Sequence, residues 1–147
     1  MKLRASLAAL GAAIVLGTTG TLALPAVAAS AHSSTHTLTF ISLTRKSATL
    51  TKTSGAQQDT DVNAAGKTVG FDLLYFRATS AGAGVVNIAV DTTGGFLYGT
   101  LTLNLKTSAL TNGEVTGGTG TFAGATGTIK AKDLSSTKTA VTITYSG

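Results

Sequence analysis

Beyond its first 25 residues the sequence contains no cysteine, proline, methionine or tryptophan. The missing cysteines exclude disulfide bonds and thiol chemistry in the folded domain. Charged residues make up only 12% of the chain, and no window shows an apolar pattern of helical period. Stability must therefore come from an apolar core and from backbone hydrogen bonds, with oligomerisation as a further source.

The first 28 residues have the pattern of a secretory signal peptide. Lys2 and Arg4 precede an almost uncharged apolar stretch over residues 7–24, and small residues suited to signal peptidase follow it. Cleavage after Ala28 or after Ala31 fits equally well. We therefore expect a secreted, extracellular protein.

A retained membrane anchor is the alternative interpretation, because about 20 apolar residues can span a bilayer. Glycines and threonines within residues 7–24 favour the signal peptide. After cleavage we expect no membrane association. Residues 29–36 (ASAHSSTH) are expected to form a flexible lead-in, and residues 37–147 a single domain.

The basic residues of the mature domain are few and scattered. Without Lys2 and Arg4, nine lysines and arginines remain against six acids, a net charge of +3. A nucleic-acid surface usually needs a clustered basic patch. The sequence shows none, so we expect no nucleic-acid partner.

Short runs of threonine, aliphatic and aromatic residues fill the domain, and turn residues interrupt them about every eight to twelve residues, as in all-β sandwiches and barrels. We expect eight strands, at residues 37–45, 47–54, 67–78, 84–91, 96–106, 111–118, 127–134 and 138–145. Each has one apolar face at period two, which indicates a closed eight-stranded antiparallel β-barrel. Residues 55–66 (GAQQDTDVNAAG) are expected to form one long polar loop.

The strand expected at residues 67–78 is apolar on both faces. One face carries Gly70, Asp72, Leu74 and Phe76, and the other carries Val69, Phe71, Leu73, Tyr75 and Arg77. The outer face of a barrel strand normally meets water, so an apolar outer face indicates a subunit contact. We therefore expect a homo-oligomer.

The glycine-rich stretch VTGGTGTFAGATG, residues 115–127, invites comparison with a phosphate-binding loop. A dinucleotide fingerprint needs G-x-G-x-x-G followed by a helix, but Gly118, Gly120 and Gly124 have a longer last spacing, and the residues that follow alternate like a strand. The Gly-Lys-Thr at residues 66–68 lacks the first glycine of a P-loop. The glycines are better explained as a corner between two barrel strands.

The same stretch resembles the signature segment of the allene oxide cyclase and dirigent barrel superfamily. Residues 66–76 (GKTVGFDLLYF) are similar to a strand opening of that family, and residues 94–103 (GGFLYGTLTL) lie at the expected spacing. The resemblance implies an eight-stranded barrel with an apolar cavity, commonly a trimer, that folds or orients a reactive small molecule. It implies no metal and no organic cofactor. Phe76 stands where the plant cyclases carry a cysteine.

Asp72 is the strongest catalytic candidate, because an acid on an apolar interior face has its charged form disfavoured and suits general acid or base chemistry. We expect a small apolar or aromatic ligand held by apolar side chains from the neighbouring strands: Leu74, Phe76, Ile88, Leu103 and Phe122. Asp133 is expected at the barrel rim. Asp59 and Asp61 are expected to be solvated in the polar loop.

The function predicted from these residues is a secreted barrel that binds a small molecule, either as an isomerase or cyclase or by steering a coupling reaction. The alternative is a non-catalytic carrier, or a structural or surface module whose barrel is filled by side chains. The two differ in the barrel interior, since a ligand site needs an open cavity of about 300 Å³ or more.

Overall fold

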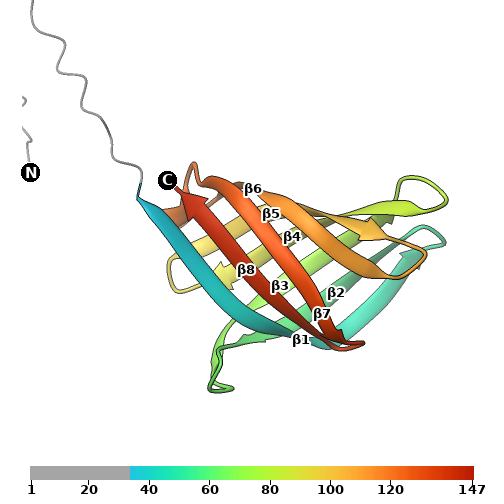
Figure 1. The fold of residues 1–147 in the computed structure, drawn as a ribbon, viewed down its shortest axis with the longest axis horizontal. Coiled ribbons are helices and arrows are strands. Elements are labelled where there is room, and N and C mark those ends of the chain that lie inside the picture. Colours follow the sequence, from blue (N-terminus) through green and yellow to red (C-terminus); the bar gives the residue numbers. More distant parts are fainter. Residues whose placement is uncertain (1–33) are drawn as a thin grey trace, which may run out of the picture. The chain divides into compact units, whose positions relative to one another are not determined.

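Eight antiparallel strands form a closed barrel in the computed structural model, which describes residues 34–147 (Figure 1). Each strand pairs with the next along the chain, and the pairing of the first with the last closes the barrel. The strands are β1 (Thr35–Thr51), β2 (Ser54–Val62), β3 (Thr68–Ala78), β4 (Ala83–Thr92), β5 (Gly95–Asn104), β6 (Ala109–Gly118), β7 (Thr126–Ser135) and β8 (Lys138–Ser146). The predicted fold class is confirmed.

A short 3-10 helix, η1 (Gly120–Phe122), lies between β6 and β7. No helix within residues 34–147 is long and apolar enough to cross a membrane. The predicted signal peptide and residues 29–33 of the predicted lead-in lie outside the described residues. β1 begins at Thr35, two residues before the expected start of the barrel.

The first two predicted strands are one strand, and the predicted loop at residues 55–66 is largely a strand. The break expected near Lys46 is a β-bulge between Thr44 and Lys46 in the β1–β2 ladder. The real turn comes after Thr51, where the Thr51 hydroxyl accepts a hydrogen bond from the backbone amide of Thr53 at 3.1 Å. β2 then runs as far as Val62. β2 has polar side chains on both faces, so its sequence lacks the alternation of apolar and polar residues that predicts a strand.

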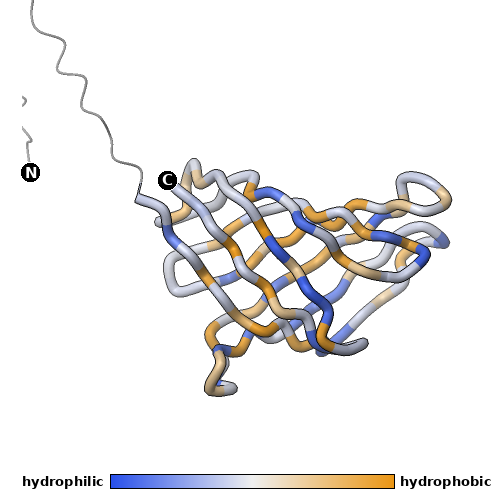
Figure 2. Tube along the Cα trace, viewed as in Figure 1, coloured by the Kyte–Doolittle hydropathy of each residue, from blue (hydrophilic) through white to orange (hydrophobic). Residues whose placement is uncertain are grey.

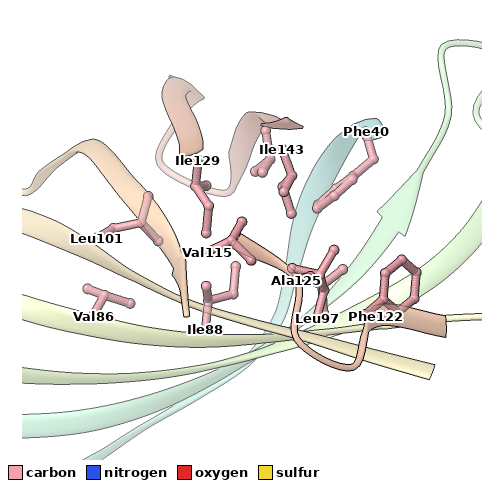
Figure 3. Close-up of a cluster of buried hydrophobic side chains, with 12 residues drawn as sticks. Phe40, Val86, Ile88, Leu97, Leu101, Val115, Phe122, Ala125, Ile129 and Ile143 are labelled. Carbon is pink, nitrogen blue, oxygen red and sulfur yellow. The ribbon is translucent and has the colours of Figure 1, made fainter. Parts of the chain in front are cut away.

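Hydrophobic and hydrophilic residues alternate along the strands (Figure 2), and in β4 and β5 every second residue is buried or nearly so. The inward side chains form one apolar cluster, in which residues from opposite walls point toward one another (Figure 3). Its members are Phe40, Val86, Ile88, Val90, Leu97, Leu101, Val115, Phe122, Ala125, Ile129, Val141 and Ile143. The interior faces predicted for β4 and β5 are the observed ones.

The glycine-rich segment forms a corner that closes one end of the barrel. Gly120 and Gly124 have φ values of 59° and 78°, a left-handed conformation that favours glycine. They place Phe122 in the core, where its ring packs edge-on against Tyr145 with centroids 5.4 Å apart. The β6–β7 ladder stops just before this corner, at the Val115–Gly127 pair. The segment is thus a strand connection, and no helix that could bind a phosphate follows it.

Candidate functional site

Two adjacent strands bring three aspartates together inside the barrel. Asp59 and Asp61 lie on β2, and Asp72 lies on β3 directly opposite Asp59 in the ladder. Because side chains alternate along a strand, all three project from inward-facing positions. Their exposed fractions are 3% for Asp59 and 1% for both Asp61 and Asp72. Buried acids without basic partners are rare in protein interiors, so this cluster is the strongest functional candidate of the domain.

Within residues 34–147, the side-chain hydrogen bonds to the cluster go to Asp59. The Ser42 hydroxyl donates a hydrogen bond of 2.7 Å to Asp59 Oδ2, and the Gln57 amide nitrogen donates one of 2.8 Å to the same oxygen. Gln57 Nε2 also donates to the Thr44 hydroxyl at 3.1 Å. These contacts orient the Asp59 carboxylate and leave Oδ1 free.

Five buried carboxylate oxygens have no hydrogen-bond donor among the described residues. They are Asp59 Oδ1 and both side-chain oxygens of Asp61 and of Asp72. A buried acceptor without a donor costs about 1–3 kcal/mol, and more when it is charged. Proteins retain such groups where a function requires them.

The environment raises the pKa values of Asp61 and Asp72. For Asp61 the causes are burial and then the negative charge of Asp72, which raise its pKa to about 8. For Asp72, burial and then the charge of Asp59 raise the pKa to about 6. Because the pKa of Asp61 lies above 7, a proton is held in this buried pair at neutral pH.

The carboxylates face a small chamber in the barrel interior. It has a volume of about 20 Å³ and is lined by Ser42, Gln57, Asp59, Asp72, Leu74, Ile88, Leu101, Leu110, Ile129, Ala131, Thr139 and Val141. A cavity of this size holds about one water-sized group. The chamber thus presents carboxylates on one wall and aliphatic side chains on the others.

A larger cavity lies beyond the chamber and opens between the hairpin turns at the end of the barrel opposite η1. Its volume is about 640 Å³, within the range of small-molecule sites. It is lined by Thr44, Gln57, Leu74, Phe76, Val86, Leu103, Leu105, Thr107, Ser108, Leu110, Asp133, Ser135, Ser136 and Thr139. Gln57, Leu74, Leu110 and Thr139 line both spaces. We call the larger space the mouth cavity and the smaller one the carboxylate chamber.

Most of the predicted site residues lie around these two spaces. Asp72, Leu74 and Ile88 line the carboxylate chamber, and Phe76 and Leu103 line the mouth cavity. Phe122 is placed differently: it is buried in the core at the closed end and lines neither space. The reason is the corner formed by the glycine segment, which turns Phe122 against Tyr145.

Sequence reasoning missed two of the three aspartates of the carboxylate cluster. Asp59 and Asp61 were expected to be solvated, which is wrong, because residues 54–62 form a barrel strand. Gln57, Asp59 and Asp61 are spaced two residues apart. This spacing is the one sequence signal that places them on the same face of a strand. Asp133 does lie exposed at the rim, where its Oδ1 accepts a hydrogen bond from the Thr139 hydroxyl at 3.0 Å.

The three aspartates do not form a metal site. Within residues 34–147, no group of three or more histidine, cysteine, aspartate or glutamate side chains is placed to hold a metal ion. No lysine, arginine or histidine lines the chamber or the mouth cavity of the described barrel. The arrangement can donate and accept protons, and it can accept hydrogen bonds from a ligand.

The outer face of β3 is apolar and exposed, as its sequence predicts. Leu73 and Tyr75 are 46% and 41% exposed, and Tyr98 on β5 is 38% exposed. Leu73 and Tyr98 both pair with Ala89 of β4, so the three lie side by side across the sheet. Phe96 stacks on Tyr98 with centroids 6.3 Å apart and extends this apolar face.

No protein-family model matches the sequence, and no curated protein matches it at a significant level. Solved structures with the same fold do exist. One described as pyocyanin demethylase aligns with a TM-score of 0.58 at 16% identity, over 75% of this chain and 99% of that chain. AbnU, an exo-specific intermolecular Diels-Alderase, aligns with a TM-score of 0.61 at 10% identity, over 78% and 99%. A nonspecific heme-binding cyclase that catalyses a cycloaddition in neoabyssomicin biosynthesis aligns with a TM-score of 0.63 at 10% identity, over 81% and 70%.

At these identities the similarity shows the fold alone. It establishes that eight-stranded barrels of this kind include cyclases. Evidence for the function of this chain must therefore come from the side chains that line its own barrel.

Proposed function

We propose that this chain is a small-molecule-binding barrel of the allene oxide cyclase and dirigent type, acting as an isomerase or cyclase. One observation carries the proposal. A cavity of about 640 Å³, lined by both aliphatic and hydroxyl side chains, leads to a buried group of carboxyls that has no basic partner among the described residues. An apolar body would occupy the mouth cavity, and a reacting or anchoring group would reach the carboxylate chamber.

The size of the cavity favours ligand binding over a purely structural role. A structural module has no need for an open interior, and empty space in a core costs stability. Pockets that bind small molecules measure about 300–1,000 Å³ and combine apolar walls with a few polar groups. The mouth cavity and the carboxylate chamber together have these properties. A non-catalytic carrier would have the same cavity. Only an enzyme would convert the bound molecule, so a turnover measurement distinguishes the two roles.

The proposed chemistry is proton transfer to a substrate that the barrel holds in a folded conformation. The pair formed by Asp61 and Asp72 stores a proton at neutral pH, and Asp72 lines the chamber that a substrate group can enter. Donation of this proton and its return from another substrate position would complete an isomerisation with no other reactant. The aliphatic walls would supply orientation, which can contribute more to the rate than the proton transfer.

Blocking the cavity tests the proposal. We expect Leu74→Trp to abolish the binding of small apolar and aromatic molecules, because Leu74 lines both spaces and an indole would fill the passage between them. Thermal shift with a panel of such molecules identifies ligands of the unaltered barrel, and calorimetry then gives their affinities. An affinity loss of at least about tenfold is expected, since a blocked site forfeits more than 1.4 kcal/mol of contact.

Leu134→Trp is the matched control, because Leu134 is 52% exposed and lines neither space. It should leave every affinity unchanged. Ligands that bind Leu74→Trp as well as the unaltered barrel would place the binding site elsewhere and contradict the proposal.

We also propose that the apolar face of β3 and β5 mediates self-association, with a trimer as the expected state. Its exposed members are Leu73, Tyr75 and Tyr98, and monomeric proteins seldom expose such a continuous apolar area. We expect Leu73→Lys to shift the protein to monomers in light scattering coupled to size exclusion, because three buried ammonium groups would repel one another. Leu50→Lys, at another exposed leucine, near the end of β1, should leave the mass unchanged. A monomeric unaltered protein would contradict the proposal.

Export of the mature barrel remains part of the proposal. It is supported by the composition of residues 1–28. Amino-terminal sequencing of protein collected from the culture medium should start at residue 29 or residue 32. Recovery of the chain only from cells, starting at Met1, would contradict export.

A further inference from the structure

We propose that the ligand of this barrel carries a protonated amine, or another cationic nitrogen with N–H donors, which binds between Asp59 and Asp72 at the carboxylate chamber. The inference depends on the proposed function, because it takes a ligand in the cavity as given and specifies its chemical class. An apolar or aromatic body fills the mouth cavity, and the cationic head enters first.

The hydrogen-bonding capacity of the chamber points to a donor-rich head group. Asp59 Oδ1 and both Asp72 oxygens are buried acceptors without a donor, and both residues line the chamber. Asp61 adds two more unpartnered oxygens at the next inward position, two residues further along β2. An ammonium group has three donors and no acceptor. It therefore complements a wall of acceptors on which a carboxylate or phosphate ligand would be repelled.

The volumes of the two spaces also indicate a ligand with a small head group and a large body. The chamber measures about 20 Å³, enough for one group the size of water or ammonium. The mouth cavity is about thirty times larger and its deep walls, at Leu74, Val86 and Leu103, are apolar. A small charged head and a large apolar body match this division.

Charge favours a cation over a neutral donor such as an alcohol. The residues that line the two spaces include three carboxylates and no basic side chain within the described barrel. Buried ionised groups are stable only when they are paired, and a cationic head is the partner that the protein itself does not supply. A metal ion is disfavoured because the side chains of this barrel do not converge as a ligand set.

Protons compete with the cation for the same oxygens, which makes binding depend on pH. The titratable groups that line the chamber are Asp59 from β2 and Asp72 from β3; Asp61 from β2 interacts with Asp72, and Asp133 from β7 lies at the mouth. As pH rises from 6 to 8.5, Asp61 and Asp72 lose protons, while an alkylamine keeps its charge because its pKa is about 10. The affinity for an amine should rise over this interval, and the affinity for a neutral analogue should stay constant.

A matched series of probes tests the inference: 4-phenylbutylamine, 4-phenylbutanol and 4-phenylbutyrate, measured by calorimetry at pH 6 and pH 8.5. We expect the amine to bind at least about tenfold more tightly than the alcohol at pH 8.5, a difference of 1.4 kcal/mol or more. The carboxylate should bind most weakly. Binding of the amine should release protons, which appears as a dependence of the heat on the ionisation enthalpy of the buffer.

Two variants locate the preference. Asp72→Asn should remove most of the advantage of the amine over the alcohol, whereas Asp133→Asn, which removes a carboxylate at the exposed rim, should retain it. Loss of the preference in Asp133→Asn alone would assign it to the rim and overturn the inference. Equal binding of the alcohol and the amine to the unaltered barrel, blocked by Leu74→Trp, would also overturn it and leave the proposed function intact. Absence of binding by all three probes and by the wider panel would remove both proposals.

Discussion

Replacement of Asp72 by asparagine should lower turnover by about 10²- to 10⁴-fold, the range over which a positioned acid or base contributes to catalysis. Asparagine has nearly the same shape, so the barrel should fold, but it cannot give up or take a proton. The loss should appear in kcat, measured with a substrate that the panel identifies. The affinity of a neutral ligand, which depends on the apolar walls, should change little.

The control is Glu114→Gln, which also replaces a carboxylate by an amide. Glu114 is exposed on β6 and lines neither the carboxylate chamber nor the mouth cavity. Its replacement should leave kcat within a factor of two or three, as is usual for surface substitutions. Unchanged kcat in Asp72→Asn would exclude Asp72 from proton transfer, and a loss confined to KM would assign it to binding alone.

The second large effect concerns stability, which should fall as the pH rises from 5 to 8.5. In the unfolded chain, aspartates release their protons near pH 3.9. In the folded barrel, Asp61 and Asp72 keep theirs to higher pH, because burial raises their pKa values to about 8 and about 6. Between these limits the folded state binds more protons than the unfolded state, so each increase in pH favours unfolding. Below about pH 4 both states are protonated and this dependence vanishes.

Asp61→Asn should therefore stabilise the barrel at pH 8.5 and flatten its pH profile. The gain should be on the order of 2–4 kcal/mol at pH 8.5, because the variant has no carboxyl group to ionise inside the barrel. Urea unfolding at several pH values, with the midpoint and slope both fitted, measures it. Asp133→Asn, an exposed acid on β7, serves as the reference. A midpoint of the unaltered barrel that is constant or rises toward pH 8.5 would show that the cluster is not protonated.

The architecture could be predicted because apolar and polar residues alternate in the sequence wherever a strand has one apolar face. β4 and β5 show this pattern, with inward residues such as Ile88 and Leu101 buried in the core. β2 breaks the rule, since its inward positions include Asp59 and Asp61 and its outward positions are polar as well. The sequence of a strand that is polar on both faces resembles that of a loop. β2 can therefore be recognised as a strand only from its pairing with β1 and β3.

The site could be predicted only in part for the same reason. Asp72 is conspicuous because it is the single acid of β3, where most of its neighbours are apolar, and its interior position follows from parity along β3. The convergence of Asp59 with Asp72 depends on the β2–β3 register, which the bulge between Asp61 and Val62 helps to set. Nothing in the local sequence specifies that register. Burial of an acid cluster also opposes the usual preference of aspartate for water, and functional sites are where such exceptions occur.

The corner that places Phe122 in the core has a consequence for which molecules this barrel can process. A cavity closed at one end, with carboxylates at its floor, would hold the proposed ligand in one orientation, with the head at the carboxylates and the tail at the hairpin turns. Branches or substituents near the head would meet packed aliphatic walls, whereas extensions at the tail would project into solvent. Selectivity should therefore be strict at one end of a molecule and permissive at the other, and a fluorophore tethered to the tail would report binding without occupying the site.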